Sequence, residues 1–173
     1  MRSTILVAAL AAFPLTTLAQ NPDADVPTAV AVVQDRDGNE IGNVRFLESP
    51  SGYLQVIVQL EGLDAGVNAA HLHETGECEG DFSSAGGHIA GDKEHGIFAE
   101  NGPHPGDLPN VHIQEDGVVA AEFFTDRIDI ATMMDDDGSA FILHNQSDDY
   151  TSQPAGNAGD RIACGVVRDA VED

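Results

Sequence analysis

The chain has 173 residues, enough for one domain with a sizeable hydrophobic core. It carries 30 acidic residues against 7 lysines and arginines, so its formal net charge is −23. This charge excludes a nucleic-acid partner, because phosphate binding requires clustered lysine and arginine side chains. It also opposes binding to an anionic membrane surface.

The first 19 residues have the pattern of a secretory signal peptide. Arg2 supplies a short positive region, an apolar run extends from Ile5 to Leu15, and Thr17-Leu18-Ala19 is a small-x-small cleavage site. The run is too short to favour a membrane span. We therefore expect residues 1–19 to be removed and residues 20–173 to form a single exported domain without a membrane anchor.

Two cysteines, Cys78 and Cys164, follow the expected cleavage site. In an exported chain, a pair of cysteines favours a single disulfide. Two buried free thiols are the alternative that the residues by themselves leave open.

Short runs of alternating or β-branched residues recur along the chain, separated by turn residues such as glycine, proline, asparagine and aspartate. No stretch has a sustained period of 3.6 residues, so helix content should be minor. This pattern predicts an all-β sandwich or barrel. The expected strands cover Ala29–Val33, Ile41–Leu47, Tyr53–Leu60, Ala69–His73, Val118–Phe124, Ile128–Met133, Ser139–His144 and Ile162–Val167.

Two long polar stretches interrupt this pattern, at Glu74–Asn110 and at Asn145–Asp160. Loops of this length inside a compact domain usually have a function. The first stretch is rich in glycine, and a bound metal ion would order a loop that has no core of its own. Its candidate metal ligands are His88, His95, His104 and Asp107.

The most informative short motif is His71-Leu72-His73. In a strand, residues at i and i+2 point to the same face, so Leu72 should face inward and the two histidines outward. Neighbouring imidazoles suit copper or zinc, although two histidines by themselves are also compatible with an ordinary polar surface. Asp148 and Asp149 could accept a hydrogen bond from the second ring nitrogen of such a ligand.

Four separate segments, in this order, resemble the copper–zinc superoxide dismutase family. Two of their motifs, Ser84-Ala85-Gly86-Gly87-His88 and Gly106-Asp107-Leu108-Pro109-Asn110, resemble its bacterial exported branch. The four segments are His71-Leu72-His73-Glu74-x-Gly76-x-Cys78, Ser84-Ala85-Gly86-Gly87-His88, Gly102-Pro103-His104-x-Gly106-Asp107-Leu108-Pro109-Asn110 and Gly156-Asn157-Ala158-Gly159-Asp160-Arg161-Ile162-Ala163-Cys164-Gly165-Val166. The resemblance covers the mature chain from about the first strand to the last. It implies a Greek-key β-sandwich, or flattened barrel, of about eight antiparallel strands with two long functional loops.

The resemblance also implies two metals, copper and zinc. The implied copper ligands are His71, His73, His88 and His144, and the implied zinc ligands are His88, His95, His104 and Asp107, so His88 would bridge the two ions. Asp148 matches the carboxylate that ties a copper histidine to a zinc histidine. Cys78 and Cys164 match the family's intrachain disulfide, and Arg161 matches the arginine that guides and binds the anion. His112 matches no role and is expected to be a surface histidine.

The activity implied by the resemblance is dismutation of superoxide to dioxygen and hydrogen peroxide, with Arg161 and His88 as catalytic residues. The implied location is the periplasm, with secretion as the alternative, and the enzyme would be a monomer or a homodimer. The step from His88 to His95 is one residue shorter than the family's usual spacing, which keeps open a copper-only enzyme. A metal-binding or copper-delivery module on the same fold is a further alternative.

Overall fold

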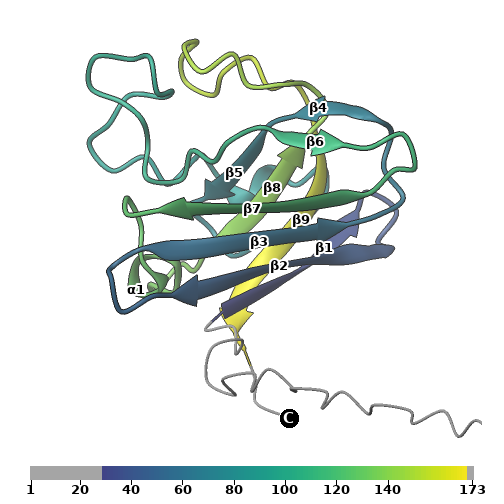
Figure 1. Cartoon of the computed structure of the whole chain (residues 1–173), viewed down its shortest axis with the longest axis horizontal. Coiled ribbons are helices and arrows are strands. Elements are labelled where there is room, and N and C mark those ends of the chain that lie inside the picture. Colours follow the sequence, from purple (N-terminus) through teal and green to yellow (C-terminus); the bar gives the residue numbers. More distant parts are fainter. Residues whose placement is uncertain (1–28, 171–173) are drawn as a thin grey trace, which may run out of the picture.

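The computed structural model describes residues 29–170, and the expected signal peptide lies outside this range. Within it, nine strands account for nearly all regular structure (Figure 1). Their bounds are β1 (Ala29–Asp35), β2 (Glu40–Glu48), β3 (Leu54–Leu60), β4 (Gly66–Asn68), β5 (Ala70–His73), β6 (Val111–Ile113), β7 (Val119–Thr125), β8 (Ala140–His144) and β9 (Arg161–Asp169). The two helical elements are a 3₁₀ turn, η1 (Ser83–Ala85), and one short helix, α1 (Ile130–Met133).

Seven of the strands form one curled antiparallel sheet in the order β5-β8-β9-β1-β2-β3-β7, and β4 pairs with β6 in a separate ribbon. The ribbon lies beside the edge strand β7, while β4 continues through a single residue, Ala69, into the other edge strand, β5 (Figure 1). The ribbon therefore bridges the two sheet edges and nearly closes a flattened barrel. The chain crosses from β3 to β5 and returns to place β7 beside β3, as in a Greek key. The predicted fold class is confirmed.

The core follows from the alternation of side chains along each strand. In β3, Leu54, Val56, Val58 and Leu60 are buried, and the intervening residues are more exposed. Phe46 of β2 is fully buried in the same cluster. The opposite face of β5 carries His71 and His73, while that of β8 carries His144 and two apolar residues, Ala140 and Ile142, of a second, smaller cluster.

The prediction differs from the structure at two places. The expected strand over Ile128–Met133 is wrong, because Asp129 caps a short helix there by accepting a hydrogen bond from the backbone N–H of Thr132 at 2.8 Å. The ribbon formed by β4 and β6 was not expected. Each of its strands has only three residues, too few for a clear alternating pattern.

The two long connections, residues 74–110 and 145–160, lie over the same end of the sheet, next to β5 and β8 (Figure 1). They meet directly: the N–H of Phe98 donates to the carbonyl of Tyr150 at 3.3 Å. Among residues 29–170, no helix is both long and apolar enough to cross a membrane.

Cys78 and Cys164 form a disulfide, as predicted, which joins the first long connection to β9. The two cysteines are 86 residues apart in sequence. A cross-link that closes so long a loop restricts the unfolded chain strongly.

We expect the Cys78→Ala/Cys164→Ala double variant to lose about 4–5 kcal/mol of unfolding free energy, on the chain-entropy account of cross-links. Urea titration of the metal-free proteins measures this loss. Wild type kept in a strong reductant should match the variant. Equal unfolding midpoints for oxidised wild type and the variant would contradict the expectation.

Candidate metal centre

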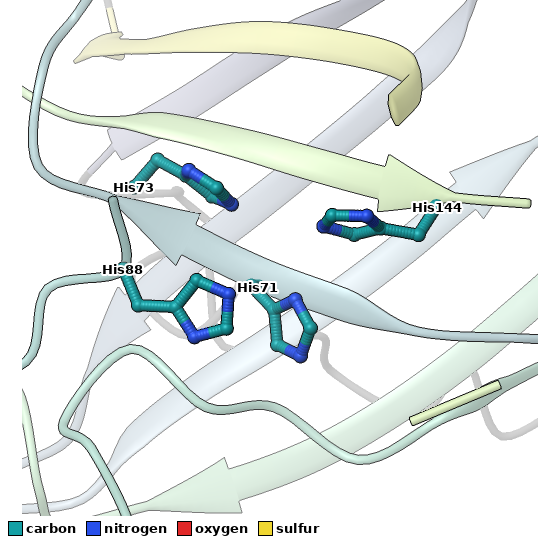
Figure 2. Close-up of side chains that lie close together, drawn as sticks. All are labelled: His71, His73, His88 and His144. Atoms are coloured by element: carbon teal, nitrogen blue, oxygen red, sulfur yellow. The ribbon is translucent and has the colours of Figure 1, made fainter. Parts of the chain in front are cut away.

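Two adjacent strands supply three of the candidate ligands. His71 and His73 lie on β5, and His144 ends the neighbouring strand β8 (Figure 2). Leu72 packs into the core between the two β5 histidines, so the predicted alternation is correct. The histidines are nevertheless buried, at 4% exposure or less, because the long connections cover this face of the sheet.

The first long connection runs back alongside β5 and brings two more candidates with it. Its backbone forms bridges that place His88 opposite His73 and Asp107 opposite His71. Leu72 holds both segments, because its N–H donates to Gly106 O and its carbonyl accepts from Ile89 N, each at 2.9 Å. Residues distant in the chain are thus delivered to the two histidines by main-chain pairing.

One nitrogen on each of four buried imidazoles has no hydrogen-bond partner. These atoms are His71 Nδ1, His73 Nε2, His88 Nε2 and His144 Nε2. The rings converge in Figure 2, and one donor atom from each lies within 4.8 Å of the others. Buried polar atoms are nearly always paired, so four converging nitrogens without partners fit a cation that accepts their lone pairs.

In three of these rings the second nitrogen is held by a carbonyl or carboxylate oxygen. His71 Nε2 donates to Asp148 Oδ2 at 2.8 Å, His73 Nδ1 to the Gly86 carbonyl at 3.0 Å, and His144 Nδ1 to the Gly159 carbonyl at 3.3 Å. Carbonyl and carboxylate oxygens only accept, so each ring keeps its proton on the held nitrogen and directs a lone pair into the cluster.

Burial keeps these rings in the neutral form that metal binding requires. It lowers the pKa of His71 to about 4 and the pKa of His144 to about 3. Burial lowers the pKa of His73 as well. At neutral pH the three imidazoles are therefore uncharged and available as ligands.

A second cluster surrounds one oxygen of Asp107. Its Oδ1 lies 2.9 Å from His88 Nδ1, 3.0 Å from His95 Nδ1 and 3.3 Å from His104 Nδ1. The shorter step between His88 and His95 thus still brings these donors together. The set His71, His88, His95 and Asp107 also has donor atoms within 4.8 Å of one another. Three imidazole nitrogens and one carboxylate oxygen are a donor set typical of zinc.

The carboxylate of Asp107 is fixed from both sides. Its Oδ2 accepts from the backbone N–H of Gly96 at 2.9 Å and of His104 at 3.0 Å. Burial by itself would raise its pKa, but the hydrogen bonds from His88 and His95 outweigh that effect and lower it. Asp107 therefore stays ionised.

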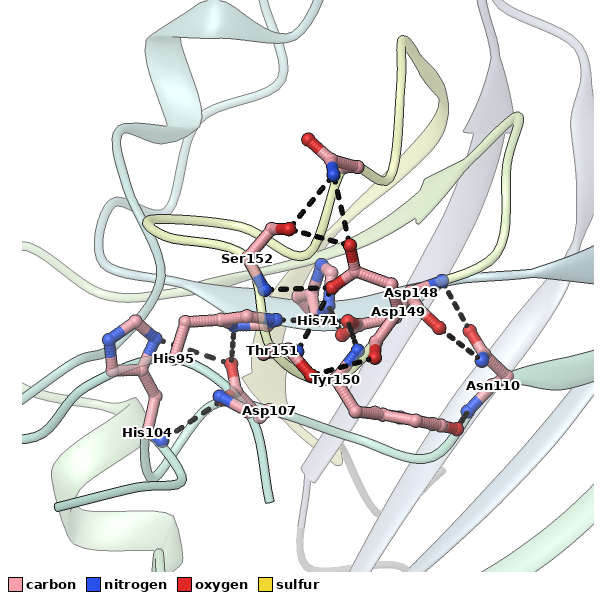
Figure 3. A network of polar contacts seen from close by, with 12 residues as sticks. His71, His95, His104, Asp107, Asn110, Asp148, Asp149, Tyr150, Thr151 and Ser152 are labelled. Atoms are coloured by element: carbon pink, nitrogen blue, oxygen red, sulfur yellow. Dashed lines mark hydrogen bonds and ion pairs between the residues drawn. The ribbon is translucent and has the colours of Figure 1, made fainter. Parts of the chain in front are cut away.

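Asp148 connects the two clusters (Figure 3). Its Oδ1 lies 3.0 Å from His95 Nε2, and its Oδ2 accepts from His71. Gly156 packs against this carboxylate so closely that a Cβ atom there would lie 1.9 Å from Asp148 Oδ1. Asp149, the other candidate acceptor, instead bonds within its own loop to Ser152.

His95 has a different charge preference from the rings on β5 and β8. Burial alone would lower the pKa of His95, but its bonds to Asp107 and Asp148 raise it to about 9. In the metal-free protein, this ring is therefore a cation held between two carboxylates.

Arg161, at the start of β9, lies close to His73 and is held there by the disulfide-linked part of the first connection. Its Nη1 donates to the Phe82 carbonyl, and its Nη2 donates to the Gly86 carbonyl at 2.6 Å. Gly86 O also accepts from His73, so one carbonyl positions both side chains. The main-chain acceptors Phe82, Gly86 and Gly159 were not predicted, since sequence carries no signal for a carbonyl's direction. His112 lies apart, exposed on β6.

Comparison with known proteins explains this arrangement. The family model described as "Copper/zinc superoxide dismutase (SODC)" matches residues 40–167. The chain belongs to the copper/zinc superoxide dismutase family. A superoxide dismutase [Cu-Zn] of Caulobacter vibrioides is 40% identical over 150 residues, covering 82% of this chain and 86% of that protein.

Solved structures agree with this assignment. A SOD-like protein from Bacillus subtilis superimposes with a TM-score of 0.73 at 36% identity, covering 79% of this chain and 96% of that one. The Cu/Zn superoxide dismutase from Brucella abortus gives 0.68 at 28% identity, covering 81% and 99%. The present chain is therefore an enzyme of this family. Its activity is superoxide dismutation and its cofactors are copper and zinc, as the sequence resemblance implied.

We expect metal-free dismutase to lose stability as the pH falls from about 6.5 toward 4. The folded-state pKa of His71 is about 4 and that of His144 about 3, below the ordinary value of 6.5, so the unfolded chain takes up these protons first. Each pKa unit corresponds to about 1.4 kcal/mol. Urea unfolding of metal-free protein across this range measures the effect. The unfolding free energy of His144→Gln should depend less on pH than that of the wild type, whereas the same change at the exposed His112 should leave the pH dependence unchanged.

Proposed function

We propose that this enzyme dismutates superoxide at a copper ion held by four histidines, with a zinc ion on the adjacent donor set. The copper ligands would be His71, His73, His88 and His144, and the zinc ligands His88, His95, His104 and Asp107. The observation that carries the proposal is the convergence of four buried imidazole nitrogens without hydrogen-bond partners. A bound cation would accept these four lone pairs and so offset the cost of burying them together.

The orientation of His88 supports a bridging role. Its Nδ1 faces Asp107 Oδ1 at 2.9 Å, while its Nε2 is one of the four unpartnered nitrogens. His71 is the competing candidate for the zinc set, but its Nε2 is bonded to Asp148 and its Nδ1 is one of the four unpartnered nitrogens of the copper cluster. His104 Nδ1 lies 3.3 Å from Asp107 Oδ1 and 3.4 Å from His88 Nδ1, which favours His104 as the remaining zinc ligand.

The reaction converts two superoxide ions and two protons into one dioxygen and one hydrogen peroxide. Copper, when bound, supplies the one-electron redox change that this reaction needs, which zinc with its filled d shell does not. Arg161 would orient the anion through charge-assisted hydrogen bonds, since its guanidinium is held in place by two carbonyls. His88 Nε2 is the atom at which we expect a proton to be held and passed to the reduced oxygen species.

Metal content measured together with superoxide consumption tests the proposal. Wild type should bind copper and zinc at one equivalent each and consume superoxide. Copper without zinc would favour a copper-only enzyme, and bound copper without turnover would favour a delivery module. His104→Ala should lose zinc and keep copper, whereas His73→Ala should do the opposite.

We further propose that the enzyme works in the periplasm, as a monomer or a homodimer. The support is the signal-peptide pattern of residues 1–19 and the sequence relation to bacterial members of the family. Fractionation of cells that express the full chain tests the location, and analytical ultracentrifugation tests the assembly.

We expect Arg161→Ala to reduce superoxide consumption about 10- to 100-fold, the equivalent of a lost charge-assisted hydrogen bond of about 1.5–3 kcal/mol. Metal content should stay at the wild-type level. Arg168→Ala removes the same charge from an exposed position on the same strand and serves as the control. Equal rates for the two variants would remove Arg161 from the proposed mechanism.

We expect the rate to change little, or to rise, as salt is added, because the net charge of −23 opposes the approach of an anion. Asp81 is an exposed carboxylate whose negative charge acts on Arg161 and raises the pKa of that guanidinium, so it contributes to this barrier. Asp81→Asn should therefore raise the low-salt rate more than Glu115→Gln, a matched change in the turn between β6 and β7. Pulse radiolysis at several ionic strengths measures both effects. A steep fall in the wild-type rate with salt would contradict this expectation.

A further inference from the structure

Two side-chain amides join the long connections in a reciprocal way. Asn110, at the end of the first connection, accepts from the N–H of Asp148 at 2.8 Å and donates to its carbonyl at 2.9 Å. Gln153, in the second connection, accepts from the N–H of His95 at 2.9 Å and donates to its carbonyl at 2.8 Å. Each connection thus holds one residue of the other by both main-chain groups.

This pairing is specific to a carboxamide. It needs one acceptor and one donor side by side, which copies the paired hydrogen bonds that two residues exchange in an antiparallel sheet. The main-chain partners also settle the orientation of each amide, since an N–H meets only the oxygen and a carbonyl only the nitrogen. A carboxylate of the same shape keeps one hydrogen bond and turns the other into a repulsion.

The two residues held in this way are the partners that link the metal clusters. His95 lies 3.0 Å from Asp107 Oδ1 on one side and 3.0 Å from Asp148 Oδ1 on the other, and Asp148 continues to His71. These contacts form a series from Asp107 through His95 and Asp148 to His71. The two central members, His95 and Asp148, are the residues that the amides hold.

Tyr150 adds two hydrogen bonds around Asp148 and Asn110 (Figure 3). Its hydroxyl accepts from the backbone N–H of Asn110 at 2.8 Å, and its own N–H donates to Asp148 Oδ1 at 2.6 Å. Gly96 lets the two connections approach this closely, since a Cβ atom there would lie 2.1 Å from the Tyr150 carbonyl. The main chain and the carboxylate of Asp148 are thus both held.

We propose that Asn110 and Gln153 are positioning residues that set the His95–Asp148 contact, and through it the affinity of the zinc set and the orientation of the copper ligand His71. This inference rests on the proposed metal ligands. Gln153 acts on His95 and therefore on the zinc set. Asn110 acts on Asp148 and therefore on both sets.

The test uses metal-free full-length protein carrying Gln153→Glu, Asn110→Asp or both, with Gln114→Glu as a charge-matched control at an exposed site. Zinc affinity is measured by competition with a chromogenic chelator, and the copper(II) environment by visible absorption and electron paramagnetic resonance. Both single variants should lose about 10-fold or more in zinc affinity, the range expected when a partner of a ligand is removed. Of the two single variants, only Asn110→Asp should also change the copper(II) spectra, because only Asn110 acts on Asp148.

The double variant adds a second criterion. Since both amides act on one contact, the combined loss of zinc affinity should be smaller than the product of the single losses. Zinc affinities within about twofold of the control for both variants would overturn the proposal. Should a carboxylate prevent folding, Gln153→Met and Asn110→Leu remove the same hydrogen bonds without charge and must show the same loss. Failure of wild type to bind zinc or copper would instead refute the proposed function.

Discussion

Four imidazole nitrogens that are buried together without hydrogen-bond partners are the constraint on which the site depends. Leaving such atoms unpaired is costly, so the fold is organised to present them to a cation. Neighbouring strands place His71, His73 and His144 on one face, and main-chain pairing to β5 adds His88. The apolar core lies on the opposite face of the same strands, so packing and metal binding use alternate residues of one segment.

The long connections supply what the strands cannot. Each ring needs its second nitrogen held so that the first carries a lone pair, and the acceptors come from loop carbonyls and from Asp148. The Gly86 carbonyl accepts from both His73 and Arg161, so the proposed copper ligand and the proposed anion-binding group depend on one main-chain acceptor. The disulfide at Cys78 attaches this part of the loop to β9, which carries Arg161.

Charge acts on two scales in this enzyme. Over the whole chain, the excess of carboxylates opposes an anionic substrate. Inside the site, Asp107 and Asp148 are turned toward histidines rather than solvent, and the guanidinium of Arg161 is anchored nearby. The same carboxylates favour cations at the donor sets and hold His95 between them.

The sequence by itself determined the all-β class, the disulfide pair, the family and the residue types of the donor sets, because strand alternation and motif order are local properties of a chain. It missed helix α1, because the run Ile128–Met133 was interpreted as a strand, and it missed the short ribbon of β4 and β6. Only the tertiary structure decided which nitrogen of each ring is free, which carbonyl holds the other, and how Asn110 and Gln153 join the loops. Those contacts pair atoms whose residues lie up to 77 positions apart in the chain, where direction rather than residue type decides the bond.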